Sequence, residues 1–182
     1  MNKFLSLALA AALCAPAFAQ QSGMINQNAP TVSQTVSAGG AKIQLDYTSI
    51  AWGRGDAFNK AMDKADGADA RKSINELAKK KPIGTFSTNV DVMVGTLKVP
   101  AGEYKVGFTI NESCEWEINF MGKETLTMKL PLKDNKDMQH KRLLCSLFAG
   151  DEKGAGVYIA FGEKVCSLSI TPGGGGGDGK KG

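Results

Sequence analysis

The stretch YKVGFTI at residues 104–110, followed by CEWEINF at residues 114–120, decides the fold of this chain. In both segments apolar side chains occupy every second position, and Asn111-Glu112-Ser113 separates them as a turn. This alternation has the period of a β-strand, in which successive side chains point to opposite faces of a sheet. We therefore expect two antiparallel strands, each with one buried face and one exposed face.

The same period of two continues on both sides of this pair. It covers residues 31–37, 41–50, 90–94, 97–99, 126–132, 143–148, 157–161 and 165–170. Gly39-Gly40 lies between the first two segments and marks a hairpin. About nine short strands at this spacing predict a mostly β fold, an antiparallel β-sandwich or a barrel-like sandwich.

One stretch, residues 56–81, has the apolar spacing of helices instead. Asp56 can cap a first helix, Gly67 separates it from a second, and Pro82 ends the second. We expect this short helical insertion to cover an open end or edge of the sandwich.

The two ends of the chain differ from this β-domain. Lys3, the apolar run 4–16 and the small residues Ala17 and Ala19 have the pattern of a signal peptide over residues 1–19, cleaved near Ala19. The sequence then predicts a flexible lead-in at 20–30, a single β-domain at 31–171 and a disordered glycine-rich tail at 172–182. The leader predicts a secreted or periplasmic protein.

The charge of the chain excludes some partners. The formal net charge is +4, and the leader holds only Lys3, so the mature chain carries about +3. This balance is too mild to indicate nucleic acid. No segment approaches the roughly 20 apolar residues of a transmembrane helix, so we expect no membrane-spanning segment. For a secreted or periplasmic protein, we expect an unidentified envelope component or protein as the partner.

Candidate catalytic residues are few. The single histidine, His140, is followed by Lys141 and Arg142 rather than by a carboxylate that could orient it. Glu115 and Glu117 flank Trp116 on one face of a strand, which is a spacing that paired-carboxylate hydrolysis can use. Alternation places both on the outer, solvated face, where little perturbation of their pKa values is expected.

Metal and cofactor sites are not indicated. One histidine and scattered cysteines lack the close ligand pairs of a zinc site. The acidic groups at 63–69 and 134–137 do not match a calcium loop, and no cofactor motif is present.

Trp52 and the cysteines complete the candidate sites. Trp52 follows the second strand and could line a ligand cleft beside the helices, or pack as a corner aromatic. In a meander of the last three strands, Cys145, Ala160 and Cys166 align, so the two cysteines lie two strand spacings apart, about 9.6 Å, beyond disulfide reach. A disulfide would then join Cys114 to Cys145 or Cys166.

Several motifs occur in an order that resembles a known family. They are TVSQTV at 31–36, IQLDYTS at 43–49, FSTNVDV at 86–92, VPAGEY at 99–104 and the tryptophan strand around 115–117. This order is similar to the secreted bacterial domain-of-unknown-function family 2911, over about residues 29–171. The resemblance implies a secreted or periplasmic bacterial β-domain without an established activity.

Two functions follow from these patterns as expectations. The first is a non-catalytic binding or interaction module. The alternative is a hydrolase that acts on envelope polymers or glycans through surface carboxylates. An enzyme would need a concave site in which carboxylates converge, and a binding module would not.

Overall fold

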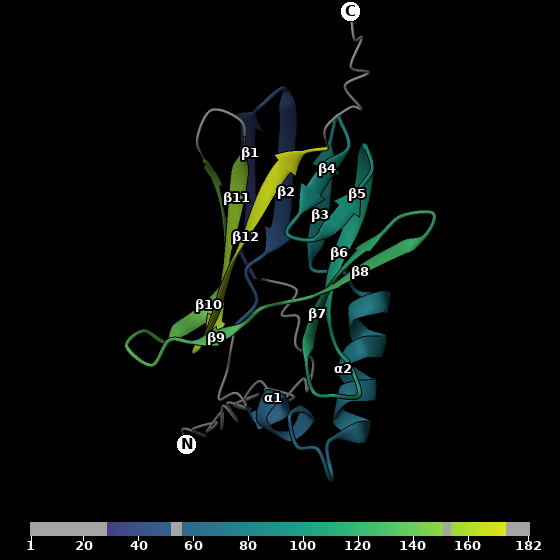
Figure 1. The fold of residues 1–182 in the computed structure, drawn as a ribbon. Coiled ribbons are helices and arrows are strands. Elements are labelled where there is room, and N and C mark those ends of the chain that lie inside the picture. Colours follow the sequence, from purple (N-terminus) through teal and green to yellow (C-terminus); the bar gives the residue numbers. More distant parts are fainter. Residues whose placement is uncertain (1–28, 52–55, 151–153, 174–182) are drawn as a thin grey trace, which may run out of the picture.

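The computed structural model describes residues 29–51, 56–150 and 154–173, and these form two packed antiparallel sheets with two short helices (Figure 1). The predicted β-sandwich with a helical insertion is confirmed. The predictions for the leader, for most of the lead-in and tail, and for Trp52 lie outside the described residues.

The first sheet has the strand order β1-β2-β3-β6-β7-β8. Its strands are β1 (Thr31–Ala38), β2 (Ala41–Thr48), β3 (Gly84–Thr88), β6 (Gly102–Ile110), β7 (Trp116–Met121) and β8 (Thr125–Lys129). The two segments that decide the fold are β6 and β7, paired antiparallel with Phe108 opposite Ile118. At the β1–β2 hairpin, Gly39 and Gly40 both have positive φ angles, of 56° and 82°, which glycine adopts without steric cost.

The second sheet has the order β10-β11-β12-β4-β5, with β9 paired to β12. Its strands are β4 (Val92–Val94), β5 (Leu97–Val99), β9 (Lys133–Asp134), β10 (His140–Ala149), β11 (Ala155–Gly162) and β12 (Lys164–Pro172). The predicted meander is present, but Cys145 and Cys166 both oppose Ile159 and not Ala160. The two cysteines still lie on strands that flank a third, as the disulfide argument requires.

The described residues contain twelve strands rather than about nine. The alternation rule missed β3, because four of its five residues are glycine, serine or threonine and only Phe86 is apolar. It also missed β9, which has two exposed residues. Strands this polar or this short depend on their neighbours for pairing and leave no periodic signal.

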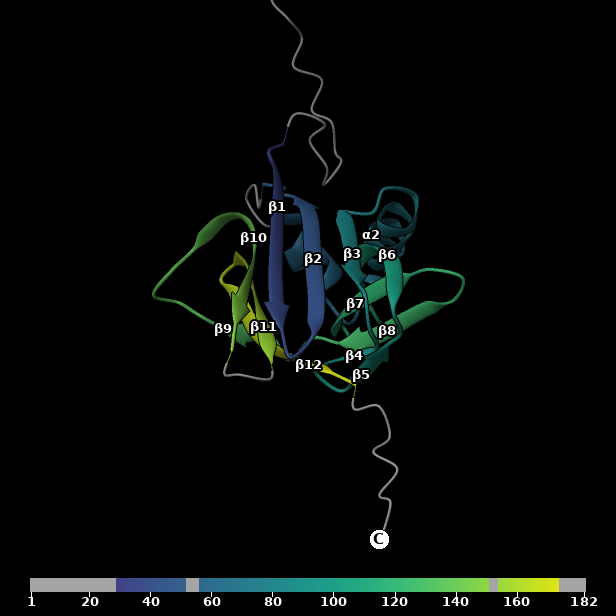
Figure 2. The same cartoon turned by 90° about the horizontal axis from the view of Figure 1, so that it is seen from above.

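The core lies between the two sheets, which Figure 2 shows from one end. Both sheets contribute apolar side chains at alternate positions, among them Leu45, Phe86 and Phe120 from the first sheet and Val157 and Ile170 from the second. The rings of Phe86 and Phe120 meet edge to face at 5.2 Å, a favourable aromatic geometry.

The helices α1 (Asp56–Ala61) and α2 (Ala68–Lys80) lie at one end of the sandwich (Figure 1). Ala61, Ile74 and Ile110 form a small second core between them and β6. The Asn75 amide also donates to the carbonyl of Ile110 and accepts its N–H, both at 2.8 Å. The predicted insertion therefore covers an end of the sandwich, because its side chains replace the backbone partners that β6 lacks there.

The edges of the two sheets are joined where β1 meets β10 (Figure 2). The side-chain amide of Gln34 donates to the carbonyl of Cys145 at 2.7 Å and accepts the N–H of Leu147 at 2.8 Å. Beyond β2, the Ser49 hydroxyl donates to the carbonyl of Leu143, and the N–H of Leu143 donates to Ile50, both at 2.8 Å. These bonds satisfy backbone groups on an edge strand and fix how the sheets meet.

The Gln34→Ala substitution should lower the free energy of unfolding by about 1–3 kcal/mol, because it leaves two partly buried backbone groups without partners. Urea unfolding measures this difference. Thr35→Ala is the control, since Thr35 is exposed on the same strand and its removal should cost less than about 0.5 kcal/mol. Equal stability of the two variants would contradict the bridging role.

Candidate functional site

The structure brings the predicted carboxylate pair together on the outer face of the first sheet. The side-chain amide of Asn111 donates to Glu115 Oε2 at 3.2 Å and to Glu117 Oε1 at 3.3 Å. Thr109 donates to the other oxygen of Glu117 at 3.3 Å. Asn111 also accepts the N–H of Glu115 at 2.9 Å, so one residue holds both the β6–β7 turn and the pair.

Glu115 forms an ion pair with Lys129 on the neighbouring strand β8. Hydrogen bonds from Lys129 and Asn111 hold the pKa of the Glu115 carboxyl below its ordinary value of 4.5. A general acid in glycoside hydrolysis needs a pKa shifted the other way, so that its carboxyl stays protonated near neutral pH. Glu115 therefore lacks the raised pKa that a general acid needs.

A polar network continues from the pair across three strands. Asn119 donates to the Thr109 hydroxyl at 2.8 Å and accepts from the Thr127 hydroxyl at 2.8 Å. By strand alternation Asn119 belongs to the same outer face as Glu115 and Glu117, which the sequence predicts to be solvated, but it is only 8% exposed. Sequence reasoning missed its burial, because the bonds join residues of different strands and no local pattern records them. Such networks stabilise a sheet through cross-strand pairs.

His140 begins β10 and lies against Tyr158, with ring centroids 6.4 Å apart. Its Nε2 atom is buried and has no hydrogen-bond partner among the described residues. A catalytic histidine needs a nucleophile or an orienting carboxylate within hydrogen-bond reach. The structure places this candidate beside an aromatic ring instead. Trp52, the candidate for ligand binding, lies outside the described residues.

Cys114, Cys145 and Cys166 are buried free thiols in the structure. Cys114 lies in the β6–β7 turn, where the Arg71 guanidinium donates to its sulfur at 3.2 Å. Cys145 and Cys166 lie between the sheets, where burial raises the pKa of Cys145 to about 12 and that of Cys166 to about 11. The pairing of Cys114 with either of them stays a prediction.

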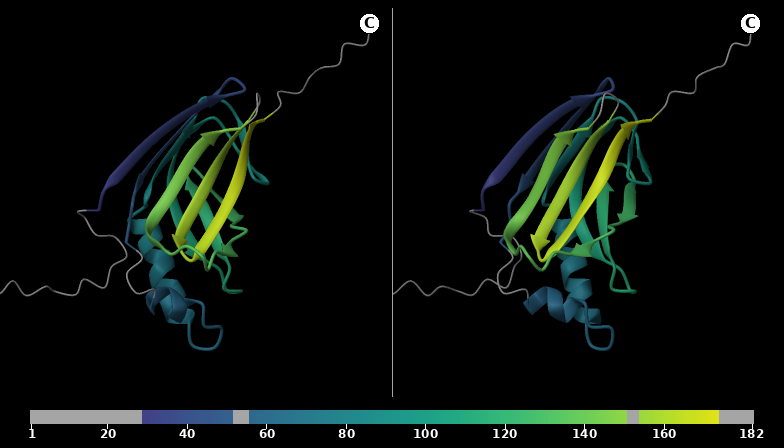
Figure 3. Two further views of the ribbon diagram at one scale, coloured as in Figure 1. Left: turned by 90° about the vertical axis from the view of Figure 1, so that its left-hand side faces the viewer. Right: turned by 60° about the vertical axis from the view of Figure 1, so that its left-hand side comes forward.

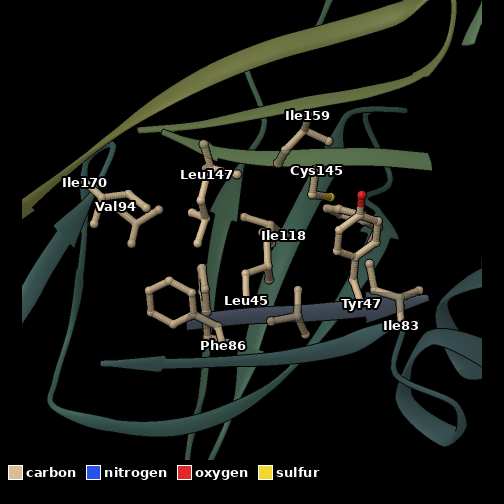
Figure 4. A pocket seen from close by; sticks show the side chains of 14 residues that line it. Leu45, Tyr47, Ile83, Phe86, Val94, Ile118, Cys145, Leu147, Ile159 and Ile170 are labelled. Carbon is tan, nitrogen blue, oxygen red and sulfur yellow. The ribbon is translucent and has the colours of Figure 1, made fainter. Parts of the chain in front are cut away.

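The interior holds an apolar cavity between the two sheets (Figure 4). Its volume is about 30 Å³, and the side chains around it include Leu45, Tyr47, Phe86 and Cys145. Drug-sized ligand pockets measure roughly 300–1,000 Å³, so this space fits a packing defect rather than a ligand site. Burial raises the pKa of Tyr47, whose oxygen accepts a hydrogen bond from the Cys145 backbone.

The outer face of β10, β11 and β12 forms a surface that sequence reasoning did not single out. Figure 3 shows these strands in front, with no described element across them. The described residues have three exposed large hydrophobic side chains, and all three lie in one segment, at Met138, Leu144 and Phe148. Leu144 and Phe148 share this face with the partly buried Tyr158.

This uncharged face, as we call it, has a distinct composition. From Leu144 to Thr171 its outward residues are Leu144, Ser146, Phe148, Gly156, Tyr158, Ala160, Val165, Ser167, Ser169 and Thr171, and none of these is charged. Basic residues border them: Arg142 on β10, Lys133 opposite Val165, and Lys98 beyond Thr171. The outer face of the first sheet, in contrast, carries Lys42, Asp46 and Glu117. The sequence shows that these residues are uncharged, but it does not show which residues of β10 point inward, so it could not identify this face.

Comparisons with known proteins supply no function. No family model matches the chain, and no match was found among curated proteins or solved structures. The resemblance to family 2911 therefore stays a prediction. Among the described residues, no group of three His, Cys, Asp or Glu side chains is arranged to hold a metal ion. No described helix is long and apolar enough to span a membrane.

At pH 8, iodoacetamide should leave Cys145 and Cys166 of the folded protein unmodified, because their raised pKa values keep both as buried thiols and only a thiolate reacts. In urea both should react. Mass spectrometry of peptides reads the modification, and the same digest without reductant reports any bridge to Cys114. Rapid alkylation of native Cys145 would contradict the structure.

Glu115 should titrate below pH 4.5 in the folded protein, and Lys129→Gln should raise its pKa toward 4.5. Because the folded pKa is lowered, the stabilisation from this carboxylate is present above the unfolded pKa and is lost as the pH falls through the folded value. Side-chain carboxyl chemical shifts in an NMR titration measure both values. A Glu115 pKa above 4.5 would revive it as a general acid.

Proposed function

We propose that the mature protein is a non-catalytic binding module of the bacterial envelope or periplasm, secreted through its leader. The observation that carries this proposal is the uncharged face, on which Leu144 and Phe148 are 38% and 44% exposed. Exposed large apolar side chains that gather on one face of a sheet are characteristic of interaction sites on soluble proteins. The residues that contact the partner are those of β10 and β11.

The hydrolase alternative has less support. The pKa of Glu115 is lowered through Lys129 and Asn111, and the pair Glu115 and Glu117 lies within a network that holds a turn. The cavity between the two sheets is lined by apolar groups and is too small for a substrate. A binding function needs neither a raised pKa nor a deep cleft.

The test uses full-length protein produced in a bacterium and purified from the periplasmic fraction. We expect its chain to begin at Gln20, as intact mass reports, and the protein to co-sediment with washed cell envelopes. The double variant Leu144→Ser with Phe148→Ser should lose most of this co-sedimentation, because the exposed apolar contacts are removed. Circular dichroism confirms that both proteins are folded.

The matched control is the double variant Glu115→Gln with Glu117→Gln. It should sediment as the unchanged protein does, and neither protein should release soluble sugar or peptide from the envelopes. Release of fragments that depends on Glu115 or Glu117 would favour the hydrolase. The proposed function would be overturned if the full-length protein were found only in the cytoplasm. It would also be overturned if the double variant of Leu144 and Phe148 co-sedimented as much as the unchanged protein.

A further inference from the structure

We infer that the uncharged face binds a neutral carbohydrate chain, with one sugar ring stacked on Phe148. The inference rests on the proposed function and names the class of ligand for the same surface. Three observations carry it: the position of the Phe148 ring over Gly156, the hydroxyl groups beside it, and the lack of charge.

The end of the Phe148 ring lies over a residue that has no side chain. It pairs directly with Gly156 on β11. A Cβ atom built at Gly156 would lie 2.3 Å from Cζ and 2.6 Å from Cε2 of the Phe148 ring. The end of the ring therefore covers the glycine backbone, and because Phe148 is 44% exposed, part of the ring is accessible to solvent. An exposed aromatic face is electron-rich and attracts the C–H groups of a sugar ring.

Hydroxyl groups form the next row of the same face. Ser146, Tyr158 and Ser167 are direct partners across β10, β11 and β12. Adjacent strands are about 4.8 Å apart, so the row spans roughly 10 Å beside the aromatic ring. A hydroxyl both donates and accepts hydrogen bonds, which matches the hydroxyl groups of a carbohydrate. Tyr158 is held at its edge by His140, at a ring distance of 6.4 Å.

The lack of charge selects among ligands. Basic side chains border the face at Arg142, Lys133 and Lys98. The residues paired with Phe148 and those of the hydroxyl row are uncharged, so a polyanion or a charged peptide seated on these two rows meets no opposite charge there. A second copy of the chain is also a poor fit. Ser146 separates the two exposed large apolar residues of this face, Leu144 and Phe148, whereas permanent dimer interfaces are large and mostly apolar.

The experiment titrates the full mature protein with two neutral sugars, chitohexaose and cellohexaose, by isothermal calorimetry. At least one should bind, and Phe148→Ala should weaken that binding by about tenfold or more, which is about 1.4 kcal/mol. Phe148→Tyr should retain binding, because the aromatic face remains. Gly156→Ala should weaken it although Phe148 is intact, since the added Cβ lifts the ring from its position.

Met138→Ala is the matched control, because Met138 is the most exposed large apolar residue that the structure describes and lies outside this face. It should bind as the unchanged protein does, and thermal unfolding should show that all variants are folded. Binding that is insensitive to Phe148→Ala, tighter binding of polygalacturonate, or a dimer that dissociates in Phe148→Ala without sugar binding would overturn the inference. Envelope co-sedimentation that depends on Phe148, without binding of either hexasaccharide, would remove the carbohydrate and leave the proposed function standing.

Discussion

The whole domain depends on how two sheets share one core without leaving backbone groups unpaired at their edges. Where β1 meets β10, the amide of Gln34 acts as a short piece of strand, since it donates to one backbone group of β10 and accepts from another. The bonds of Ser49 and Ile50 to Leu143 continue this junction toward the helices. Each bond is individually modest, but an unpaired buried group would cost more than the bond contributes.

This junction also decides which residues of β10 reach solvent. The backbone groups of Cys145 and Leu147 bind Gln34, and their side chains lie in the core. The period of a strand then requires Leu144 and Phe148 to point outward. The uncharged face is therefore a consequence of register on a rigid sheet, and no loop conformation is needed to form it. Binding groups on strands are held more precisely than groups on loops, which suits a site that works by shape and stacking.

Part of this arrangement could be predicted from the sequence. Strands β6 and β7 alternate clearly, so the inward position of Ile118 and the outward position of Glu117 follow from local pattern. Strand β10 is apolar at both parities, at 143, 145 and 147 and again at 144 and 148, so periodicity cannot assign its faces. Only its pairing with β11 and its contact with Gln34 settle the assignment, and both join residues far apart in the chain.

Structural contacts alone account for the residues of the carboxylate cluster, but not for every feature of the uncharged face. Glu115 and Glu117 are accounted for by structure, because Asn111, Thr109 and Lys129 bind them and tie a turn to three strands. The same donors that stabilise this corner keep Glu115 ionised and remove the protonated state that acid catalysis needs. Phe148 covers Gly156, and an aromatic ring over a glycine of the neighbouring strand also stabilises a sheet. Sheet stability does not require the exposure of this ring, however: Phe148 is 44% exposed beside a row of hydroxyl groups, and this is the part of the arrangement for which a ligand accounts.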